Sequence, residues 1–487
     1  MQLTKVGSAS EELRGVYFEE RPSFSTIPQD FICPITGQLF EDPVTLETGQ
    51  TFERKAIKAW FDQGNRTCPV TGKPLECKQV PSTNLVLKRL VDTWKSQHCR
   101  HLLERRDERD STTLVLEQLL LTTAFTKEER MANARHLVSL GGLRFLLQRF
   151  ECGDIEEKTR VVALFVCCVE ADSGCRNRIA RDIDMKCVAE LIHCKQVKAR
   201  ANVVVLLIEL ICRKRKDDVI RFLYGLQNEY EGIESTMHAL LVYLQSSPPP
   251  QRPLVAVLLL YLDVLVEPRK YSIYREEAVD AITEALKASL ANEKIRENCC
   301  RALLILGGRF SSSGKSLTDR WILNRSGFSV NHEANSPENE ENGLLSDDEE
   351  SNEEWLRSFS ASLLGNGKRS FLEAISKCFG SENLDLIKVC LTTVAWLSFS
   401  LASMSETELH LPAFSALVPR LKESLEHGHD IEHKVLASTS LLNFSKISEC
   451  RVLLMSMAEN LRTPLGRLVE VTWTAKMLFS IISGEAL

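Results

Sequence analysis

Two short turns near the start of the chain suggest metal chemistry, because each contains a cysteine. They read Cys-Pro-Ile-Thr at 33–36 and Cys-Pro-Val-Thr at 68–71. A closed zinc site needs four ligands, usually two Cys-x-x-Cys pairs or their histidine variants, whereas each turn offers one cysteine. No histidine occurs between Phe31 and Gln97. The spacing therefore predicts a metal-free scaffold, with no cofactor, held by hydrogen bonds and by an apolar core of Phe31, Leu46, Ile57, Phe61, Leu87 and Leu90.

Other stretches that look like sites lack the spacing that their chemistry requires. Covalent catalysis by cysteine needs an activated thiolate, and the four cysteines of the first hundred residues have only His98 nearby. Gly308–Ser316 resembles a phosphate-binding loop, but it has five intervening residues instead of four and follows a helical pattern. We therefore predict no nucleophile and no nucleotide site.

The cysteine turns lie in a segment, Pro28–Cys99, where turn signals recur every few residues. Short extended pieces at 44–46 and near Thr51 predict a hairpin. A helix over Glu53–Gln63 follows, because apolar residues recur on one face and a glycine then stops it. A second helix begins after Ser82 or Thr83. These elements predict a compact ββα module.

From about Thr112 onward the chain reads as amphipathic helices, and their most apolar stretches repeat. Phe165, Leu207, Leu259, Leu304, Leu397 and Leu442 mark equivalent positions, separated by steps of about 42, 52, 45, 93 and 45 residues. Armadillo and HEAT repeats have periods of ~40 to 47 residues, so the sequence predicts an armadillo/HEAT-like α-solenoid and a mainly α protein. The 93-residue step is close to two repeats.

The long step contains a polar, acidic stretch that cannot bury enough apolar surface to offset chain entropy. We predict a disordered acidic insertion at 311–354, in which Ser346, ahead of four carboxylates, is a candidate phosphorylation site. Alternatively, this stretch could be a solvated linker with no further role. The expected organisation is a flexible tail at 1–26, the ββα module at 27–100, repeats at 101–310, the insertion at 311–354 and further repeats at 355–487.

Composition sets limits on partners and compartment. The chain is 44% apolar and 26% charged with a net charge of −6, and no long basic stripe of the kind that phosphate binding needs is present. The most apolar runs, Val203–Cys212 and Pro253–Val266, are shorter than the ~20 residues of a spanning helix. We expect no nucleic-acid binding, no membrane insertion, a cytoplasmic or nuclear location, and reduced cysteines that pack as small hydrophobes.

Several stretches of the ββα module follow one another in a recognisable order: Pro28–Thr36, Asp42–Val44, Thr48–Arg54, Ile57, Trp60, Thr67–Thr71 and Pro81–Lys88. Together, over about 70 residues, they resemble the U-box of plant U-box ubiquitin ligases. A U-box followed by an armadillo-type body is the arrangement of the plant U-box/armadillo ligases, and the sequence of this U-box looks most similar to the legume Cerberus/Lin type. Members of that type usually continue into WD40 repeats, which this chain lacks, so we expect a shorter relative, an isoform or a fragment.

The resemblance implies a zinc-free relative of the RING fold that binds a ubiquitin-conjugating enzyme on an apolar shelf. Ile35, Trp60 and Pro69 match the family's contact positions. Isoleucine and proline in exposed turns also suit an interaction site on physical grounds. Alternatively, Ile35 and Pro69 could cap the small core, and Trp60 could serve packing alone.

One position departs from the family pattern. Where many such ligases have a basic residue that contacts ubiquitin, this chain has Gly72, with Lys73 next. Either Lys73 substitutes, or activation of the conjugating enzyme is weak.

The resemblance implies a ligase that needs no nucleophile of its own: a substrate lysine attacks the thioester of ubiquitin on the conjugating enzyme, and the ligase contributes proximity. Its partners would be the conjugating enzyme, ubiquitin and a protein substrate on the repeats. The competing hypothesis is a non-catalytic armadillo scaffold with a weakened U-box. Substrate, chain linkage and oligomeric state cannot be read from the sequence.

Overall fold

A computed structural model of the chain describes residues 28–76, 79–104, 113, 116–117, 127–226, 233–266, 272–328, 349–365, 370–404 and 407–484. The predicted tail at 1–26 and the candidate phosphorylation site Ser346 lie outside these residues. Internal contacts divide the chain into two units, Met1–Glu108 and Arg109–Leu487, which are considered separately.

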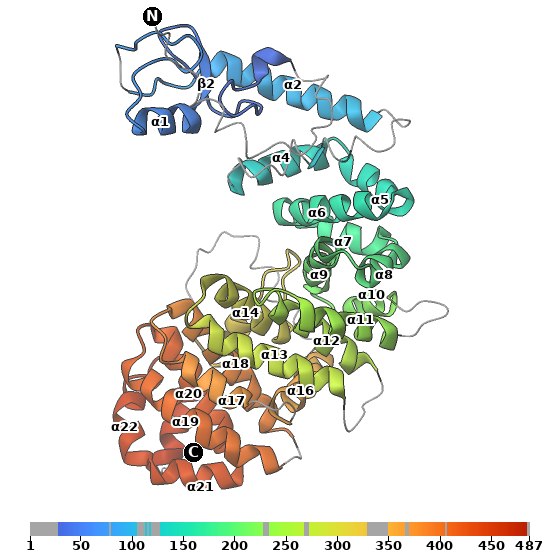
Figure 1. The fold of residues 1–487 in the computed structure, drawn as a ribbon. Coiled ribbons are helices and arrows are strands. Elements are labelled where there is room, and N and C mark those ends of the chain that lie inside the picture. Colours follow the sequence, from blue (N-terminus) through green and yellow to red (C-terminus); the bar gives the residue numbers. More distant parts are fainter. Residues whose placement is uncertain are drawn as a thin grey trace, which may run out of the picture. The chain divides into compact units, whose positions relative to one another are not determined.

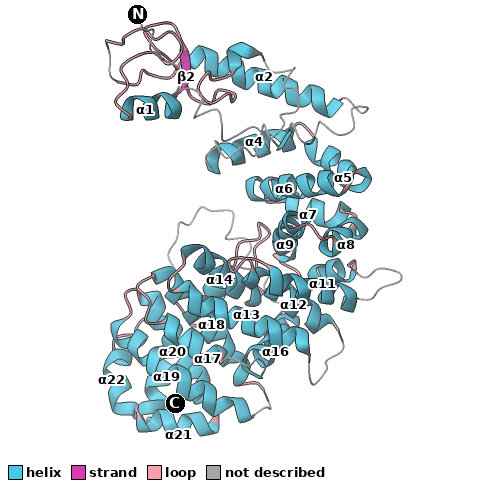
Figure 2. Ribbon diagram, in the orientation of Figure 1, coloured by secondary structure: helices cyan, strands magenta, loops and turns pink. Residues whose placement is uncertain are grey.

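The first unit contains the predicted hairpin and both predicted helices (Figure 2). After the short 3₁₀ helix η1 (Gln29–Phe31), strands β1 (Pro43–Thr45) and β2 (Thr51–Glu53) pair antiparallel, with Val44 opposite Phe52. Helix α1 (Arg54–Asp62) follows β2 directly, and α2 (Leu85–Glu104) closes the unit. The ββα prediction is confirmed.

The core of the first unit is small and differs in part from the predicted one. Leu46 and Ile57 are buried as expected, and Phe31, Phe61 and Leu87 pack against the core. Leu90 was wrongly predicted, since it is 54% exposed; on α2 the neighbouring Val91 faces the core instead. The remaining buried members are Cys33, Phe40, Val44, Phe52 and Cys68.

The second unit is built from stacked helices (Figure 1). Several begin at a side chain that accepts a backbone N–H: Asp154, Asn292 and Asn383 each cap a helix in this way. The helices are α4 (Lys127–Ser139), α5 (Gly142–Cys152), α6 (Ile155–Ala171), α7 (Gly174–Asp182), α8 (Met185–His193), α9 (Val197–Ile211), α10 (Lys216–Tyr224), α11 (Ile233–Ser246), α12 (Arg252–Leu265), α13 (Ile273–Ser289), α14 (Glu293–Leu306), α15 (Thr318–Arg325), α16 (Glu349–Gly365), α17 (Phe371–Cys378), α18 (Leu384–Leu401), α19 (His410–His427), α20 (Ile431–Ser445), α21 (Ser448–Ser456), α22 (Ala458–Gly466) and α23 (Trp473–Ser483), with η3 (Thr407–Leu409) before α19.

The six apolar stretches that repeat in the sequence lie in α6, α9, α12, α14, α18 and α20, and each of these helices packs on the next. A second row, α8, α11, α13, α17 and α19, packs in the same consecutive manner, and the two rows contact one another through pairs such as α12 with α13 and α19 with α20. This is the predicted armadillo-like solenoid, in which each repeat buries its apolar face against its neighbours.

The long step between repeats is a single step of the solenoid rather than two. Helix α14 packs directly on α18, so the extra residues are an insertion within one repeat. Within the insertion, α15 packs against α18 and α20, while α16 packs against α12, α13, α17 and α18.

The prediction of disorder over residues 311–354 therefore included ordered residues at both of its ends. Residues 311–328 are described and folded, and α16 begins at Glu349; residues 329–348 lie outside the described part. Composition misled the prediction because the order comes from distant partners. Arg176 Nη1 donates to the Ser313 carbonyl, Phe310 bridges to Ser316, and Trp321 is buried against the guanidinium of Arg309, 3.8 Å from the ring centre.

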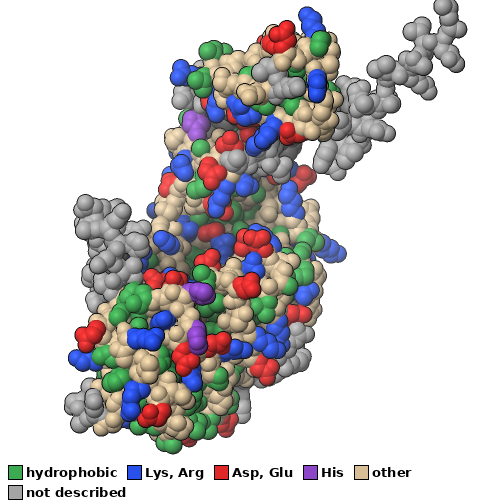
Figure 3. Space-filling view, turned by 90° about the vertical axis from the view of Figure 1, so that its left-hand side faces the viewer, with side chains coloured by type: hydrophobic (Ala, Val, Ile, Leu, Met, Phe, Trp, Pro, Cys, Tyr) green, Lys and Arg blue, Asp and Glu red, His purple; other side chains and the backbone are tan. Residues whose placement is uncertain are grey.

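Within the described residues, one helix, α18, is long and apolar enough to span a membrane by length and composition. Of this 18-residue helix, 67% is buried, because α14, α16 and α20 pack around it. Burial among other helices is what a core helix of the solenoid requires. On the face drawn in Figure 3, basic and acidic side chains are interspersed over the helices, with no large patch of one sign.

Candidate functional site

The two cysteine turns form loops of the same construction. In the first, the Cys33 N–H donates to the Gln38 carbonyl (2.7 Å) and the Gly37 N–H to the Cys33 carbonyl (2.8 Å). In the second, the Cys68 N–H donates to the Lys73 carbonyl (2.8 Å) and the Gly72 N–H to the Cys68 carbonyl (2.9 Å). The motif Cys-Pro-x-Thr-Gly therefore encodes one loop twice, with the residue after proline at each tip.

Each cysteine sulfur accepts a hydrogen bond from the β1–β2 hairpin. Cys33 Sγ accepts from the Glu53 N–H (3.3 Å), and Cys68 Sγ accepts from the Thr48 hydroxyl (3.5 Å). Burial raises the pKa of the Cys68 thiol, but hydrogen bonds from Thr48, Thr71 and the loop backbone outweigh it and lower the pKa to about 7. Both side chains are almost completely buried, and their hydrogen bonds tie the two loops to the β1–β2 hairpin.

A polar network joins the start of α1 to the segments that precede β1 and α2. Arg54 Nε donates to the Asp42 carboxylate (2.6 Å), which also accepts from the Thr83 hydroxyl (2.5 Å). The same guanidinium donates to Thr83 Oγ1 and to the Pro81 carbonyl, both at 2.9 Å. Burial raises the pKa of Asp42, but the hydrogen bonds from Arg54 and Thr83 outweigh it, so the pKa lies below its ordinary value. This network fixes α1, the segment before α2 and the start of β1 together.

The predicted contact residues lie on the two loops and on α1. Ile35 is 39% exposed at the tip of the first loop, and Pro69 is half-buried in the second. Trp60 is half-buried on α1, and its Nε1 donates to the Thr67 carbonyl (2.9 Å), which ties the helix to the second loop. Thus Ile35 is not a core cap, whereas Trp60 both packs and positions the neighbouring loop.

Sequence reasoning missed Val70, the counterpart of Ile35 in the second loop. Its side chain is 51% exposed, as the Ile35 side chain is exposed in the first loop, which makes Val70 a further candidate contact residue. The signal was present in the sequence, because Cys-Pro-Ile-Thr-Gly and Cys-Pro-Val-Thr-Gly align residue for residue.

Gly72 occupies a backbone position that suits glycine. Its φ is +69°, in the left-handed region, and a Cβ there would meet nothing within 4 Å. A basic side chain at this position would have room but would strain the backbone. Lys73 follows it in the chain and is exposed, so Lys73 stays the candidate substitute for the basic residue of the family.

Comparisons with known proteins agree with the two units. A family model described as "U-box domain" matches residues 27–100, and one described as "Putative E3 ubiquitin-protein ligase LIN, ARM-like domain" matches residues 118–483. These two matches lie in the first and the second unit, respectively.

Similar proteins come from legumes and from Arabidopsis thaliana. "Putative E3 ubiquitin-protein ligase LIN-1" of Lotus japonicus is 25% identical over 93% of this chain, and "Putative E3 ubiquitin-protein ligase LIN" of Medicago truncatula is 25% identical over 86%. The chain spans 45% and 42% of their lengths. "U-box domain-containing protein 11" of Arabidopsis thaliana is 47% identical over 73 residues, which are 15% of this chain and 12% of that protein.

Proposed function

The chain belongs to the family of the LIN ARM-like domain, here joined to a U-box, and we propose that it is a ubiquitin-protein ligase of the U-box type. In this proposal the U-box binds a ubiquitin-conjugating enzyme, and the armadillo-like repeats recruit the protein that is modified. The observation that carries the proposal is the pair of matched loops, whose apolar tips, Ile35 and Val70, are exposed.

The proposed mechanism uses contact and proximity. A lysine amine of the substrate attacks the thioester carbonyl, an isopeptide bond forms, and the thiolate of the conjugating enzyme leaves. The ligase holds the thioester near the lysine and restricts its motion, an effect that can be worth several kcal/mol when the geometry is well held. Because both loop cysteines are buried, the proposal assigns no covalent role to them.

The shelf formed by the loops suits a protein partner. Ile35 and Val70 present apolar side chains to solvent, while the buried sulfurs and the Trp60 hydrogen bond keep the loops in place. A surface that is already ordered before binding loses little conformational entropy when its partner arrives.

A second candidate function is a non-catalytic scaffold that still docks partners through its U-box. The observation that favours it is Gly72, which lacks the basic side chain of many relatives of the fold. Under this reading the conjugating enzyme binds, but ubiquitin transfer is not accelerated.

The experiment is autoubiquitination of the purified chain with ubiquitin, activating enzyme and a panel of conjugating enzymes. We expect ubiquitin ladders with the wild type and a loss of about five- to thirtyfold with Ile35→Ala or Val70→Ala, which corresponds to about 1 to 2 kcal/mol of binding free energy for each truncated apolar contact. Val86→Ala is the matched control, because Val86 is 72% exposed on α2 and lies outside both loops.

The two candidate functions give different results. Ladders that persist unchanged in both loop variants would contradict binding through the shelf. Binding of a conjugating enzyme without ladders for any member of the panel would favour the scaffold.

A further inference from the structure

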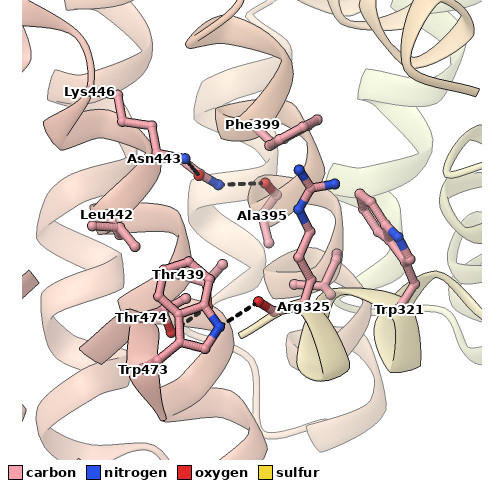
Figure 4. Close-up of a pocket in the computed structure, with 11 residues that line it drawn as sticks. Trp321, Arg325, Ala395, Phe399, Thr439, Leu442, Asn443, Lys446, Trp473 and Thr474 are labelled. Atoms are coloured by element: carbon pink, nitrogen blue, oxygen red, sulfur yellow. Dashed lines mark hydrogen bonds between the residues drawn. The ribbon is translucent and has the colours of Figure 1, made fainter. Parts of the chain in front are cut away.

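The inserted helix α15 forms one wall of a pocket with the last repeats. The other walls come from α18, α20 and α23, and the pocket is lined by side chains of all four helices (Figure 4). Trp473 Nε1 donates to the Arg325 carbonyl (2.9 Å), which fastens α23 to the end of α15. The Asn443 amide donates to the Ala395 carbonyl (3.4 Å) and so joins α20 to α18.

The pocket combines aromatic walls with positive charge. The guanidinium of Arg325 lies 5.4 Å from the ring centre of Trp321 and 4.6 Å from that of Phe399 (Figure 4). Trp473 leaves 48% of its surface exposed at the opposite wall. Arg325 and Lys446 are the charged residues among those that line the pocket, and both are cations.

These cations are incompletely neutralised by the described part of the chain. Arg325 has a carboxylate of Glu353 at 3.6 Å, but both side chains are at least one-third exposed, and exposed pairs of this kind are weak. No described carboxylate lies within ion-pair distance of Lys446, whose ammonium donates to the Asn443 side-chain oxygen (3.3 Å). Burial and the neighbouring Arg325 both lower the pKa of Lys446. An anion would relieve the repulsion between the two cations.

We propose that this pocket binds an aspartate or glutamate side chain of an extended partner peptide, flanked by bulky apolar residues. Lys446 and Arg325 would hold the carboxylate through charge-assisted hydrogen bonds. The exposed face of Trp473 would cover an apolar neighbour of the acidic residue. Charge complementarity selects an acidic peptide over a basic one, and the aromatic walls select apolar flanks over polar ones.

That this peptide belongs to a ubiquitination substrate rests on the proposed function, but its binding does not. The pocket lies in the repeats and uses no residue of the U-box. Peptide binding and autoubiquitination therefore report separately on the two proposals.

The test is fluorescence anisotropy of labelled peptides with the full chain. One peptide carries two glutamates between pairs of leucines, and a matched peptide carries two lysines in their place. We expect the glutamate peptide to bind at least about tenfold more tightly, because its carboxylates can accept charged hydrogen bonds from Lys446 and Arg325, whereas the lysines of the matched peptide repel both cations. Raising the salt concentration should weaken binding.

Variants locate the peptide. Lys446→Glu should reduce affinity for the glutamate peptide by at least about tenfold, and Lys446→Met should have a smaller effect in the same direction. Lys476→Glu is the matched control, because it makes the same charge change on α23 at an exposed residue that does not line the pocket. Circular dichroism would verify that each variant is folded.

Two results would overturn the proposal: equal binding of the two peptides, or unchanged binding of the glutamate peptide by both Lys446 variants. Autoubiquitination by Lys446→Glu should match the wild type, because the change leaves the U-box intact. If the chain binds the glutamate peptide but forms no ubiquitin ladders, the proposed ligase function is contradicted and the proposed peptide site is still supported.

Discussion

The U-box and the repeats are stabilised by different means. The described part of the U-box has two short strands and a core of few residues, so polar contacts join its elements, with Asp42, Arg54 and Thr83 at the centre. The repeats bury continuous apolar helix faces, and large side chains such as Trp396 and Phe444 are completely enclosed. A small module with few core residues depends on geometry-specific hydrogen bonds, whereas a stacked solenoid depends on packed area.

In the U-box, the exposed candidate contact residues are distinct from the residues that stabilise the fold. The exposed loop residues Ile35 and Val70 should tolerate substitution without loss of the fold, because neither belongs to the buried core. In the repeats the pocket at α15 depends on the packing that forms it, because its walls come from four helices. Variants in each region should therefore fail in different ways.

The largest effect is expected from Trp396→Ala in α18. Trp396 is 1% exposed in the row of helices that runs through the repeats, and truncation of a buried tryptophan costs about 3 to 5 kcal/mol. Hydrogen exchange measured by mass spectrometry should show faster exchange in α14, α18 and α20 and unchanged exchange in the U-box. Val197→Ala, at a residue that is 59% exposed, is the control. Equal loss of protection in both units would mean that they unfold together.

A smaller effect is expected from Asp42→Asn in the U-box. The change removes a charged acceptor of Arg54 and Thr83, which should destabilise the U-box by about 1 to 2 kcal/mol. The effect is no larger because the side chains of Arg54 and Asp42 are each about one-third exposed, and solvent screens their interaction. The loss of stability is measured by chemical unfolding, with hydrogen exchange in the U-box as the readout. Asp62→Asn, at an exposed residue of α1, is the control. If hydrogen exchange in the U-box of Asp42→Asn is as slow as in the wild type, the apolar core alone is sufficient to stabilise the U-box.

The same network predicts a pH dependence. Because the folded state lowers the pKa of Asp42 below its ordinary 3.8, the stability that its carboxylate contributes is present above that value. It is lost as pH falls through the lowered pKa. An acid titration of U-box stability should show this loss in the wild type, and Asp42→Asn should lack that part of it.

The smallest effect is expected from alanine substitutions at two glycines. Gly72→Ala should cost about 1 kcal/mol because of the left-handed backbone. Gly365→Ala, at the end of α16 where a Cβ would also meet nothing within 4 Å, should be neutral or slightly stabilising. Thermal unfolding of the two variants compares them. A neutral Gly72→Ala would permit a basic residue there and would make Gly72→Arg a direct test of the scaffold hypothesis.

Periodicity determined most of the fold. The alternation of turns and extended pieces predicted the hairpin, and the recurrence of apolar stretches predicted the row from α6 to α20. The family resemblance singled out Ile35, Trp60 and Pro69, which lie on the two loops and on α1. Whether these residues bind a conjugating enzyme stays a prediction. Local geometry suffices for such features because helices and hairpins are specified by residues close together in sequence.

The errors arose where burial depends on distant residues. Leu90 and Val91 are adjacent on one apolar helix face, and only the packing of α2 decides that Val91 is buried. The polar stretch after Ser311 is ordered because Arg176, 137 residues earlier, bonds to Ser313. The pocket closes because Trp473 bonds to Arg325 across 148 residues.

The sequence by itself determined the two units, their elements and the loop motif, because these follow from neighbours along the chain. The tertiary structure decided which polar segments are ordered and where the cations Arg325 and Lys446 meet. Contacts of this kind form between residues far apart in the chain, and their energy depends on a shared environment that no local pattern contains.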